Sequence, residues 1–395
     1  MIIFLVGLTF AEATRAMTTV QIPVFLRELG ASVGQVGLFF TLAMIVPLLL
    51  GVFGGWISDS IGRLQAILFG SLAGILGYLP FVFAQRWEVV LIGPAILAVA
   101  TSLIQPSFRA YIADSCPEET RGRVFGLSKS FITAAWILTP LLGGFLAMNF
   151  GSRIMFFVAA FFYGIAALIF IFLLRSENKE PAVPSKKPNL KSFRDSFTQI
   201  LPVIFLGGLL TWIMISDGIR IFATYLSFNL LPVYLSDIGL IDKQGLGLID
   251  GLHGIAWVVA APIGGWLCDR SSERNSFFFG TAIFLSSFVI FILADSFGLF
   301  ALSWIIMGIG AALLDPAVNA LIALGAPEHL RGVAYALIPA FIGLVALPAP
   351  WIGGQIWEVA GPKIPFLVTF LLGSFALIPA WFKLRVPDPG TITSA

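Results

Sequence analysis

The chain has 395 residues, of which 58% are hydrophobic and only 11% are charged. An average soluble domain is roughly half apolar and about a quarter charged, and a soluble fold of this length cannot bury so much apolar surface. The composition therefore excludes a cytosolic enzyme, a disordered chain, a nucleic-acid-binding protein and a disulfide-stapled secreted domain. Since the net charge of +2 is the difference between 23 basic and 21 acidic residues, their placement is more informative than their sum.

Twelve stretches are long and apolar enough to be membrane helices, which need about 20 residues each. They do not alternate in polarity as the strands of a membrane β-barrel do, so we expect an all-α polytopic membrane protein. The expected spans cover residues 2–26, 33–57, 65–85, 89–113, 124–149, 153–174, 200–235, 246–268, 276–295, 298–325, 333–357 and 364–383.

Basic residues gather in the loops that follow even-numbered spans, for example Arg121, Arg123, Lys186 and Lys187. By the positive-inside rule these loops and both termini are expected to be cytoplasmic. The polar segment 175–199 is the longest loop, and we expect it to link an N-terminal bundle (1–174) to a C-terminal bundle (200–385), with a tail at 386–395. Short loops and the absence of eukaryotic sorting signals favour a bacterial inner membrane.

An internal repeat is the strongest pattern in the sequence. The segment 54–59 recurs at 264–269, and Gln105-Pro106 recurs as Asp315-Pro316, both 210 residues later. Two more landmarks, Pro-Glu at 117 and Pro-x-x-Gly-Gly at 140, recur at the same offset. Because six spans precede the linker and six follow it, we expect two parallel six-helix repeats related by an axis along the membrane normal.

The loop between spans two and three reads GWISDSIGRL at 55–64. With the repeat, it resembles the major facilitator superfamily, whose signature at this place is roughly G-x-x-x-D-R-x-G-R-[RK]; Ser60 and Leu64 depart from it. The resemblance implies that this cluster holds the two halves in one state, while a simple helix cap at Asp59 is the other interpretation. The expected gating residues are Gly55, Asp59, Gly62, Arg63, Arg121, Gly265, Asp269, Arg270 and Arg331.

Span five is similar to the exporter-associated motif of the same family, G-x8-G-x3-G-P-x-x-G-G. Gly126, Pro140, Gly143 and Gly144 match, whereas Ala135 and Thr139 replace two glycines. Small residues let helices approach closely in lipid. The second half repeats the pattern at Pro350, Gly353 and Gly354, so two interpretations stay open, an export signature and a packing rule of the repeat.

Polar residues at membrane depth are costly and are candidates for function. Glu12, Arg15 and Thr19 share one face of span one, and Asp217, Arg220 and Thr224 have the same spacing in span seven. In the family, these two spans line the central cavity. We expect Glu12, Asp217 and Asp315 to carry protons. The expected substrate cavity comprises Arg15, Thr19, Gln105, Arg109, Trp136, Arg220, Thr224, Trp257 and Asn319.

Each of these groups also has a structural interpretation. The two acid–arginine pairs are equally consistent with static intrahelical ion pairs, and Arg109 with a structural partner of Glu12. Asp315 precedes Pro316 and is placed to bond backbone groups at a kink. The tryptophans suit the membrane interface as well as a pocket wall.

The preferred hypothesis is a secondary active transporter, not an enzyme, that exports a small amphipathic drug or metabolite by alternating access in exchange for protons. Substrate that competes for an arginine changes the proton affinity of the neighbouring acid, and no Walker A sequence is present. The alternatives are a transporter or flippase for an anionic substrate or lipid, and a non-transporting sensor. We expect a monomer in the lipid bilayer, with no metal, no cofactor and no nucleic-acid partner.

Overall fold

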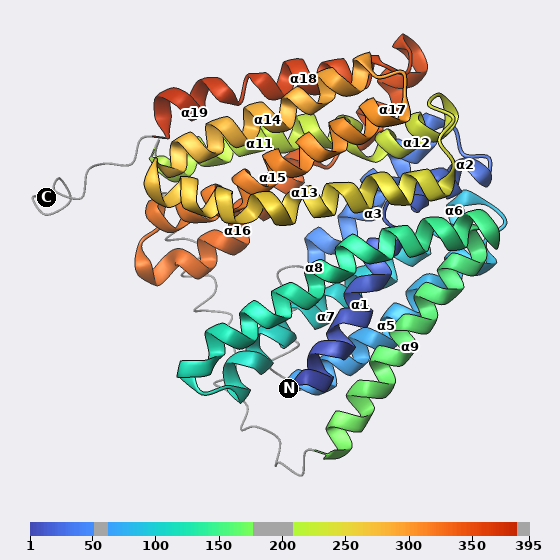
Figure 1. Ribbon diagram of the computed structural model, residues 1–395, viewed down its shortest axis with the longest axis vertical. Coiled ribbons are helices and arrows are strands. Elements are labelled where there is room, and N and C mark those ends of the chain that lie inside the picture. The colour runs from blue at the N-terminus through green and yellow to red at the C-terminus, as the bar shows by residue number, and fades with distance from the viewer. Residues whose placement is uncertain (51–61, 177–207, 385–395) are drawn as a thin grey trace, which may run out of the picture. The chain divides into compact units, whose positions relative to one another are not determined.

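The computed structural model describes residues 1–50, 62–176 and 208–384, and these consist of helices, with no strand among them (Figure 1). Elements of the first half are α1 (Ile2–Thr18), α2 (Gln21–Glu28), α3 (Val33–Leu50), α5 (Arg63–Phe83), α6 (Trp87–Val90), α7 (Ile92–Ser115), α8 (Glu118–Asn149) and α9 (Ser152–Ser176). Those of the second half are α11 (Leu209–Ser227), α12 (Leu231–Asp237), α13 (Lys243–Arg270), α14 (Glu273–Leu293), α15 (Phe297–Gly325), α16 (Arg331–Ala346), α17 (Ala349–Ala360), α18 (Ile364–Ser374) and α19 (Leu377–Lys383).

The twelve expected spans correspond to these helices. In the described residues, eleven helical segments are long and apolar enough to cross a bilayer, and the bent pair α1 and α2 raises the number to as many as twelve. The pair bends by 51°, where Thr18 and Thr19 donate their hydroxyls to the carbonyl oxygens of Thr14 and Arg15. Such back-bonding often bends a helix. The all-α membrane fold expected from the sequence is confirmed, and the chain is an integral membrane protein.

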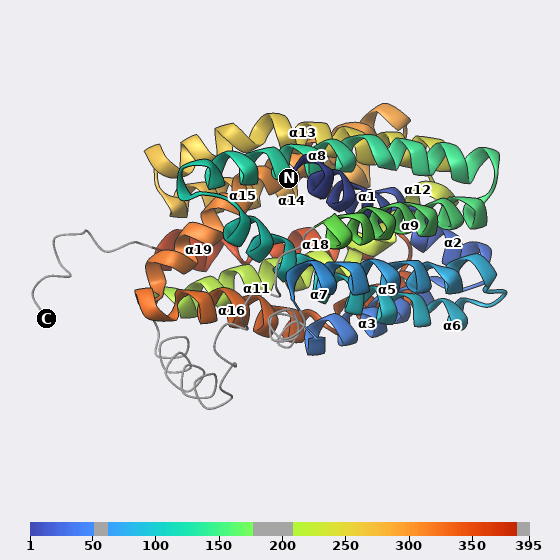
Figure 2. The same ribbon diagram turned by 90° about the horizontal axis from the view of Figure 1, so that it is seen from below.

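The described residues form two compact units. Unit 1 lies within Met1–Pro188 and Asn229–Gly254, and unit 2 lies within Asn189–Phe228 and Ile255–Ala395. In unit 1, α1 packs between α8 and α9, while α5 packs against α7 and α9 (Figure 2). Unit 1 also contains α12 and the first turns of α13, which contribute to its ion pairs below. The expected domain boundaries remain a prediction.

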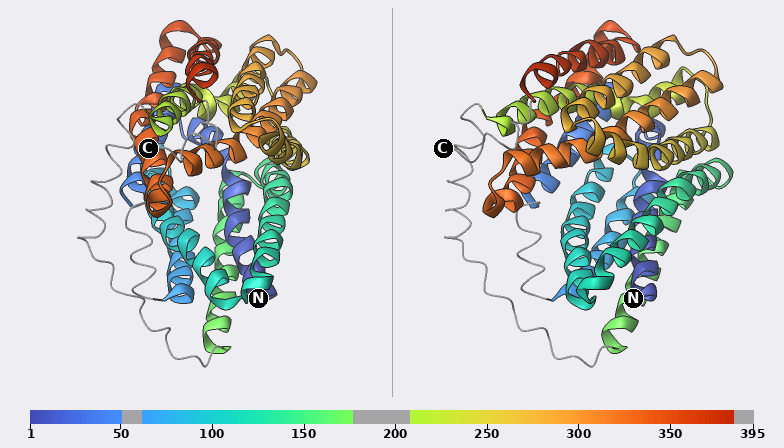
Figure 3. Two further views of the ribbon diagram at one scale, coloured as in Figure 1. Left: turned by 90° about the vertical axis from the view of Figure 1, so that its left-hand side faces the viewer. Right: turned by 60° about the vertical axis from the view of Figure 1, so that its left-hand side comes forward.

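Unit 2 repeats this packing with its own helices. Helix α11 packs against α16, α17 and α18, and α14 packs against α15; Figure 3 shows α18 (red) running beside α11 (yellow-green). Phe291, Phe366 and Trp304 form an aromatic cluster among α14, α15 and α18, with Phe291 and Phe366 centroids 4.7 Å apart. Burial of such large side chains stabilises the bundle.

The Pro-x-x-Gly-Gly repeat has the same packing role in both units. A Cβ added at Gly143 would collide with the carbonyl oxygen of Met17, and one added at Gly353 with that of Leu226. Met17 and Leu226 are themselves repeat equivalents, 209 residues apart. The glycine therefore lets α8 lie directly on the α1 backbone, and α17 on that of α11, as small residues do in membranes.

The second glycine of the first motif serves another contact. A Cβ at Gly144 would come within 2.6 Å of the Lys243 carbonyl oxygen, and one at Gly247 would collide with the Pro140 carbonyl oxygen. Helices α8 and α13 thus approach backbone to backbone within unit 1, and Gly251 and Gly254 extend this approach along α13 toward Ile137 and Trp136.

Candidate functional site

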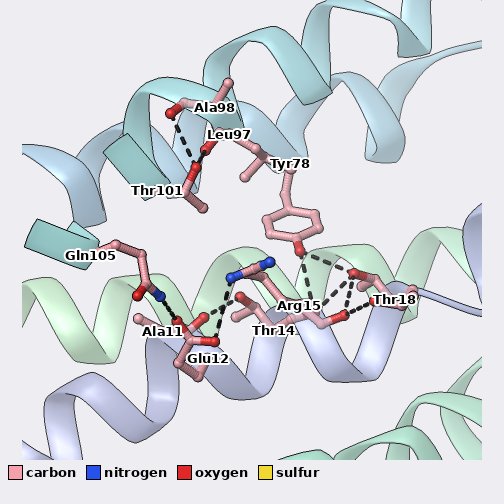
Figure 4. Close-up of polar contacts among 11 residues, drawn as sticks. Ala11, Glu12, Thr14, Arg15, Thr18, Tyr78, Leu97, Ala98, Thr101 and Gln105 are labelled. Atoms are coloured by element: carbon pink, nitrogen blue, oxygen red, sulfur yellow. Dashed lines mark hydrogen bonds and ion pairs between the residues drawn. The ribbon is translucent and has the colours of Figure 1, made fainter. Parts of the chain in front are cut away.

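Glu12 is a buried acid at membrane depth on α1, with its side chain only 7% exposed. The side-chain amide of Gln105 on α7 donates a 2.6 Å hydrogen bond to Glu12 Oε1. Arg15, one turn along α1, places Nη1 3.5 Å from Glu12 Oε2. Figure 4 shows Gln105 and Arg15 converging on the carboxylate from two directions.

The two partners of Glu12 differ in accessibility. The Arg15 side chain is 41% exposed, whereas the carboxylate it faces is buried. A buried carboxylate is tolerated when it is hydrogen-bonded and paired with a cation. The arrangement therefore joins a buried acid to a cation that is accessible to a ligand.

A hydroxyl network fixes the next turn of α1. Tyr78 on α5 is fully buried, lies 3.0 Å from the Thr18 hydroxyl and donates to the Thr14 carbonyl oxygen at 3.2 Å. On the α8 side, the Thr139 hydroxyl donates to the Ala13 carbonyl oxygen at 3.0 Å. The sequence analysis missed Tyr78 and Thr14, because a threonine or tyrosine in an apolar span gives no sign of its partner.

Asp217 and Arg220 form the second acid–arginine pair, on α11 in unit 2. Both Nε and Nη2 of Arg220 donate to Asp217 Oδ1, at 2.8 and 2.6 Å. Their side chains are 9% and 11% exposed, and the Thr224 hydroxyl donates to the Arg220 carbonyl oxygen. This pair is more buried than Glu12 and Arg15, because the Arg220 side chain is 11% exposed whereas that of Arg15 is 41% exposed.

The remaining expected cavity residues lie in several environments. Arg109 is exposed on α7, with its guanidinium carbon 5.9 Å from the Phe108 ring centroid, and it is Gln105 on this helix that bonds to Glu12. The Asn319 amide donates to the Asp315 carbonyl oxygen, and Asn319 in turn accepts from Tyr335. Trp257 packs against Ala260, Ala312 and Leu313. Thr19 is exposed, and Trp136 is half-buried.

Among the expected gating residues, Gly55 and Asp59 lie outside the described residues. Gly62 has a φ of +96°, a conformation that favours glycine. Arg63 places Nε 3.4 Å from Asp114 Oδ2. Nε of Arg121 is buried and has no hydrogen-bond acceptor among the residues that the structure describes.

The second copy of the gating motif makes local contacts. Arg270 lies over the Trp266 ring, 5.4 Å from its centroid, and Arg331 donates to the Ala323 carbonyl oxygen at 3.1 Å. Asp269 is exposed, and a Cβ at Gly265 would meet no atom within 4 Å. A latch formed by these residues remains a prediction.

An ion-pair cluster that the sequence analysis did not single out joins α2 to α12 and α13 within unit 1. Arg27 Nε lies 2.9 Å from Asp237 Oδ2, and Glu28 pairs with Lys243. Ser152 bridges the second pair, donating to Glu28 at 2.9 Å and accepting from Lys243 at 3.0 Å. These groups border a polar cavity of about 740 Å³. Glu28 and Asp237 are repeat equivalents, 209 residues apart, so each half contributes an acid at the same place.

No group of three or more His, Cys, Asp or Glu side chains suited to a metal ion occurs in the described parts of the chain. The arrangement on α1 is a hydrogen-bonded ion pair. Its two chemical elements are a buried carboxylate on a helix and an arginine whose outer atoms are accessible.

The Major Facilitator Superfamily model matches residues 4–240 and 213–395. The chain is 27% identical over 377 residues to Multidrug resistance protein MdtG of Proteus mirabilis, covering 93% of this chain and 91% of that protein. It is 25% identical over 374 residues to Multi-drug resistance efflux pump PmrA of Streptococcus pneumoniae, covering 90% and 88%. Over 176 residues it is 30% identical to Quinolone resistance protein NorA of Staphylococcus aureus, covering 44% and 45%.

Solved structures share the fold at low sequence identity. A bacterial homolog of the human lysosomal transporter Spinster, described as inward-facing and unoccupied, has a TM-score of 0.78 at 12% identity and covers 98% of this chain and 96% of its own. A D-xylose–proton symporter has a TM-score of 0.71 at 16% identity and covers 97% of both chains.

Proposed function

Because the chain belongs to the Major Facilitator Superfamily, we propose that it is a proton-coupled exporter of small amphipathic molecules in a bacterial inner membrane, with both termini cytoplasmic. The observation that carries the proposal is the buried Glu12 carboxylate, hydrogen-bonded by Gln105 and paired with the accessible Arg15. Such a carboxylate at membrane depth is a candidate proton relay.

Coupling follows from competition for the Glu12 carboxylate. In the absence of substrate, the Arg15 guanidinium and the Gln105 amide stabilise ionised Glu12. A cationic substrate that pairs with this carboxylate excludes a proton from it, whereas protonation removes the negative charge that attracts the substrate. Substrate and proton therefore exclude each other on one short segment of α1, as exchange requires.

The driving force is sufficient for such a cycle. One elementary charge that crosses a membrane potential of 100 mV gains about 2.3 kcal/mol, which corresponds to a concentration ratio of about fifty. Asp217, paired with Arg220 on α11, and Asp315 on α15 are candidates for a second proton step in unit 2.

Alternating access requires contacts that break and re-form. The pairs Arg27–Asp237 and Glu28–Lys243 join residues of the first repeat to residues of the second inside unit 1. Their side chains are roughly a quarter to a third exposed, so each pair is worth at most about 1 kcal/mol. Ion pairs of this strength stabilise one conformational state without preventing the change to the other. We assign them the role of an outer gate.

The substrate class rests on the relatives. MdtG and PmrA, each similar along about nine-tenths of the chain, carry the names of multidrug resistance proteins. We therefore propose a substrate that combines an apolar body with a polar or charged group. These names do not favour the alternatives of an anionic-lipid flippase or a sensor.

The test is transport by the purified full-length protein in proteoliposomes. We expect ethidium to be driven against its gradient when a proton gradient of the correct sign is imposed, and the pH inside to change as ethidium moves. A matched preparation with the ionophore-collapsed gradient is the control. Ethidium movement of equal rate and extent with and without the gradient would overturn proton coupling, and stabilisation in thermal shift by anions alone would overturn the substrate class.

A further inference from the structure

Unit 2 contains an apolar cavity of about 480 Å³ whose floor is α11 and whose walls are α16 and α18. Met214, Gly218 and Phe222 form part of the floor, Phe341 and Val345 belong to one wall, and Leu372 belongs to the other. No charged residue lines the cavity. Val345 is 62% exposed, so the cavity is open on one side.

A comparison with the equivalent residues of unit 1 explains why this groove is open. In unit 1 the corresponding positions on α1 and α9 hold an aromatic pair, Phe10 and Phe162, whose ring centroids are 5.3 Å apart at 83°. The equivalent residues are Ile219, at offset 209, and Leu372, at offset 210. Two smaller aliphatic side chains therefore replace two rings. Gly218 adds further space, since a Cβ there would meet no atom nearer than 3.9 Å.

A cation and an aromatic ring lie just beyond the lining residues, at the turn of α11 that precedes Met214 and Ile215. Trp212, Ile215 and Ile219 follow one face of α11 at i, i+3 and i+7. The Lys383 ammonium, at the end of the span that contains Leu372, lies 5.2 Å from the Trp212 ring centroid. Trp and Lys are typical of the membrane interface, where they contact lipid headgroups.

We propose that this groove binds one phospholipid, with an acyl chain in the apolar cavity and the phosphate at Lys383. The uncharged lining excludes the headgroup from the cavity, and it gives a cationic drug no counter-charge. The position of Lys383 just beyond the groove matches an anionic phosphate beside a chain that enters along α11. The lipid would fill the volume that Phe10 and Phe162 fill in unit 1.

The test counts bound lipid on the purified full-length protein by native mass spectrometry, with dioleoyl phosphatidylglycerol as the probe. Ile219→Phe combined with Leu372→Phe transfers the aromatic pair of unit 1 into unit 2 and should remove one bound lipid per protein. Lys383→Gln should weaken that lipid about fivefold, the effect of one basic residue near an anionic headgroup. Lys363→Gln removes the same charge at the opposite end of the span and should leave binding unchanged.

Gly218→Leu is the second variant, for the case in which the double substitution does not fold; it fills the same cavity from the floor. Dihexanoyl phosphatidylglycerol, with the same headgroup and short chains, should fail to compete. The proposal is overturned if folded variants keep the full lipid count. It is equally overturned if tetraphenylphosphonium displaces the lipid, because the groove would then belong to a drug. Loss of the lipid site with intact ethidium transport would leave the proposed exporter function untouched.

Discussion

The Gln105 side-chain amide donates a 2.6 Å hydrogen bond to Glu12 across the interface of α7 and α1. It is a neutral donor to a carboxylate that Arg15 also faces at 3.5 Å. Two groups of different kind therefore stabilise the ionised form of Glu12. The Gln105 hydrogen bond lies inside the protein, whereas the Arg15 side chain is partly exposed and is therefore accessible to a substrate.

Replacement of Gln105 by leucine removes the amide donor and keeps the volume. Hydrogen bonds to charged groups contribute about 1.5–3 kcal/mol, so the carboxylate loses a large part of what holds it in place. We expect gradient-driven ethidium transport to fall severalfold. Gln105→Glu replaces the amide by a second acid and should also lower the rate. The rate of gradient-driven ethidium transport in proteoliposomes is the measurement, and a wild-type rate in Gln105→Leu would contradict the role of this bond.

Replacement of Asp217 by asparagine leaves Arg220 buried without its ion pair. Breaking a buried pair on one side costs about 3–5 kcal/mol, so we expect a clear drop in melting temperature. The double variant Asp217→Leu with Arg220→Met removes both charges and should melt close to the wild type. Its transport rate then separates the two interpretations of the pair. Full activity marks a static ion pair, and loss of activity with normal stability marks a coupling site.

Replacement of Gly143 by alanine forces a methyl group against the Met17 carbonyl oxygen. Overpacking of this kind costs about 1–3 kcal/mol. Gly126→Ala is the matched control on the same helix, because a Cβ there meets no atom within 4 Å. Gly353→Ala should reproduce the Gly143 effect in unit 2. Equal melting temperatures for Gly143→Ala and Gly126→Ala would refute the packing role of the motif.

Replacement of Arg27 by aspartate places two acids opposite each other where α2 meets α12. We expect transport to fall severalfold and to recover when Asp237→Arg is added, because the exchanged pair restores the attraction. Arg86→Asp, which disturbs the exposed pair with Glu88, is the control and should have little effect. Absence of recovery in the double variant would show that this pair does not act as a gate.

The spans were predictable because length and hydropathy alone decide which segments enter a bilayer. The Glu12–Arg15 contact was also predictable, since the i,i+3 spacing on a helix brings two side chains together. The Gln105–Glu12 bond was not, because it joins residues 93 positions apart and depends on how α7 packs against α1. Arg109 was expected in the substrate cavity or as a structural partner of Glu12, and both roles stay predictions; the α7 residue that bonds to the acid is Gln105.

The ion pairs between α2 and the helices α12 and α13 could not be predicted, for a different reason. Arg27 and Lys243 lie at the ends of spans, and a charge there carries no information about its partner. The internal repeat could have drawn attention to these ion pairs. Glu28 and Asp237 are equivalent acids at the ends of equivalent helices, and each is next to a base in the folded unit.

The central claim is that Glu12 couples proton movement to substrate movement, and Glu12→Gln in proteoliposomes tests it most directly. Two rates are measured on one preparation, ethidium transport driven by a proton gradient and ethidium exchange without one, with Glu88→Gln as an exposed-acid control. We predict that Glu12→Gln abolishes the gradient-driven rate and keeps the exchange rate. Gradient-driven transport at the wild-type rate in Glu12→Gln would contradict the account.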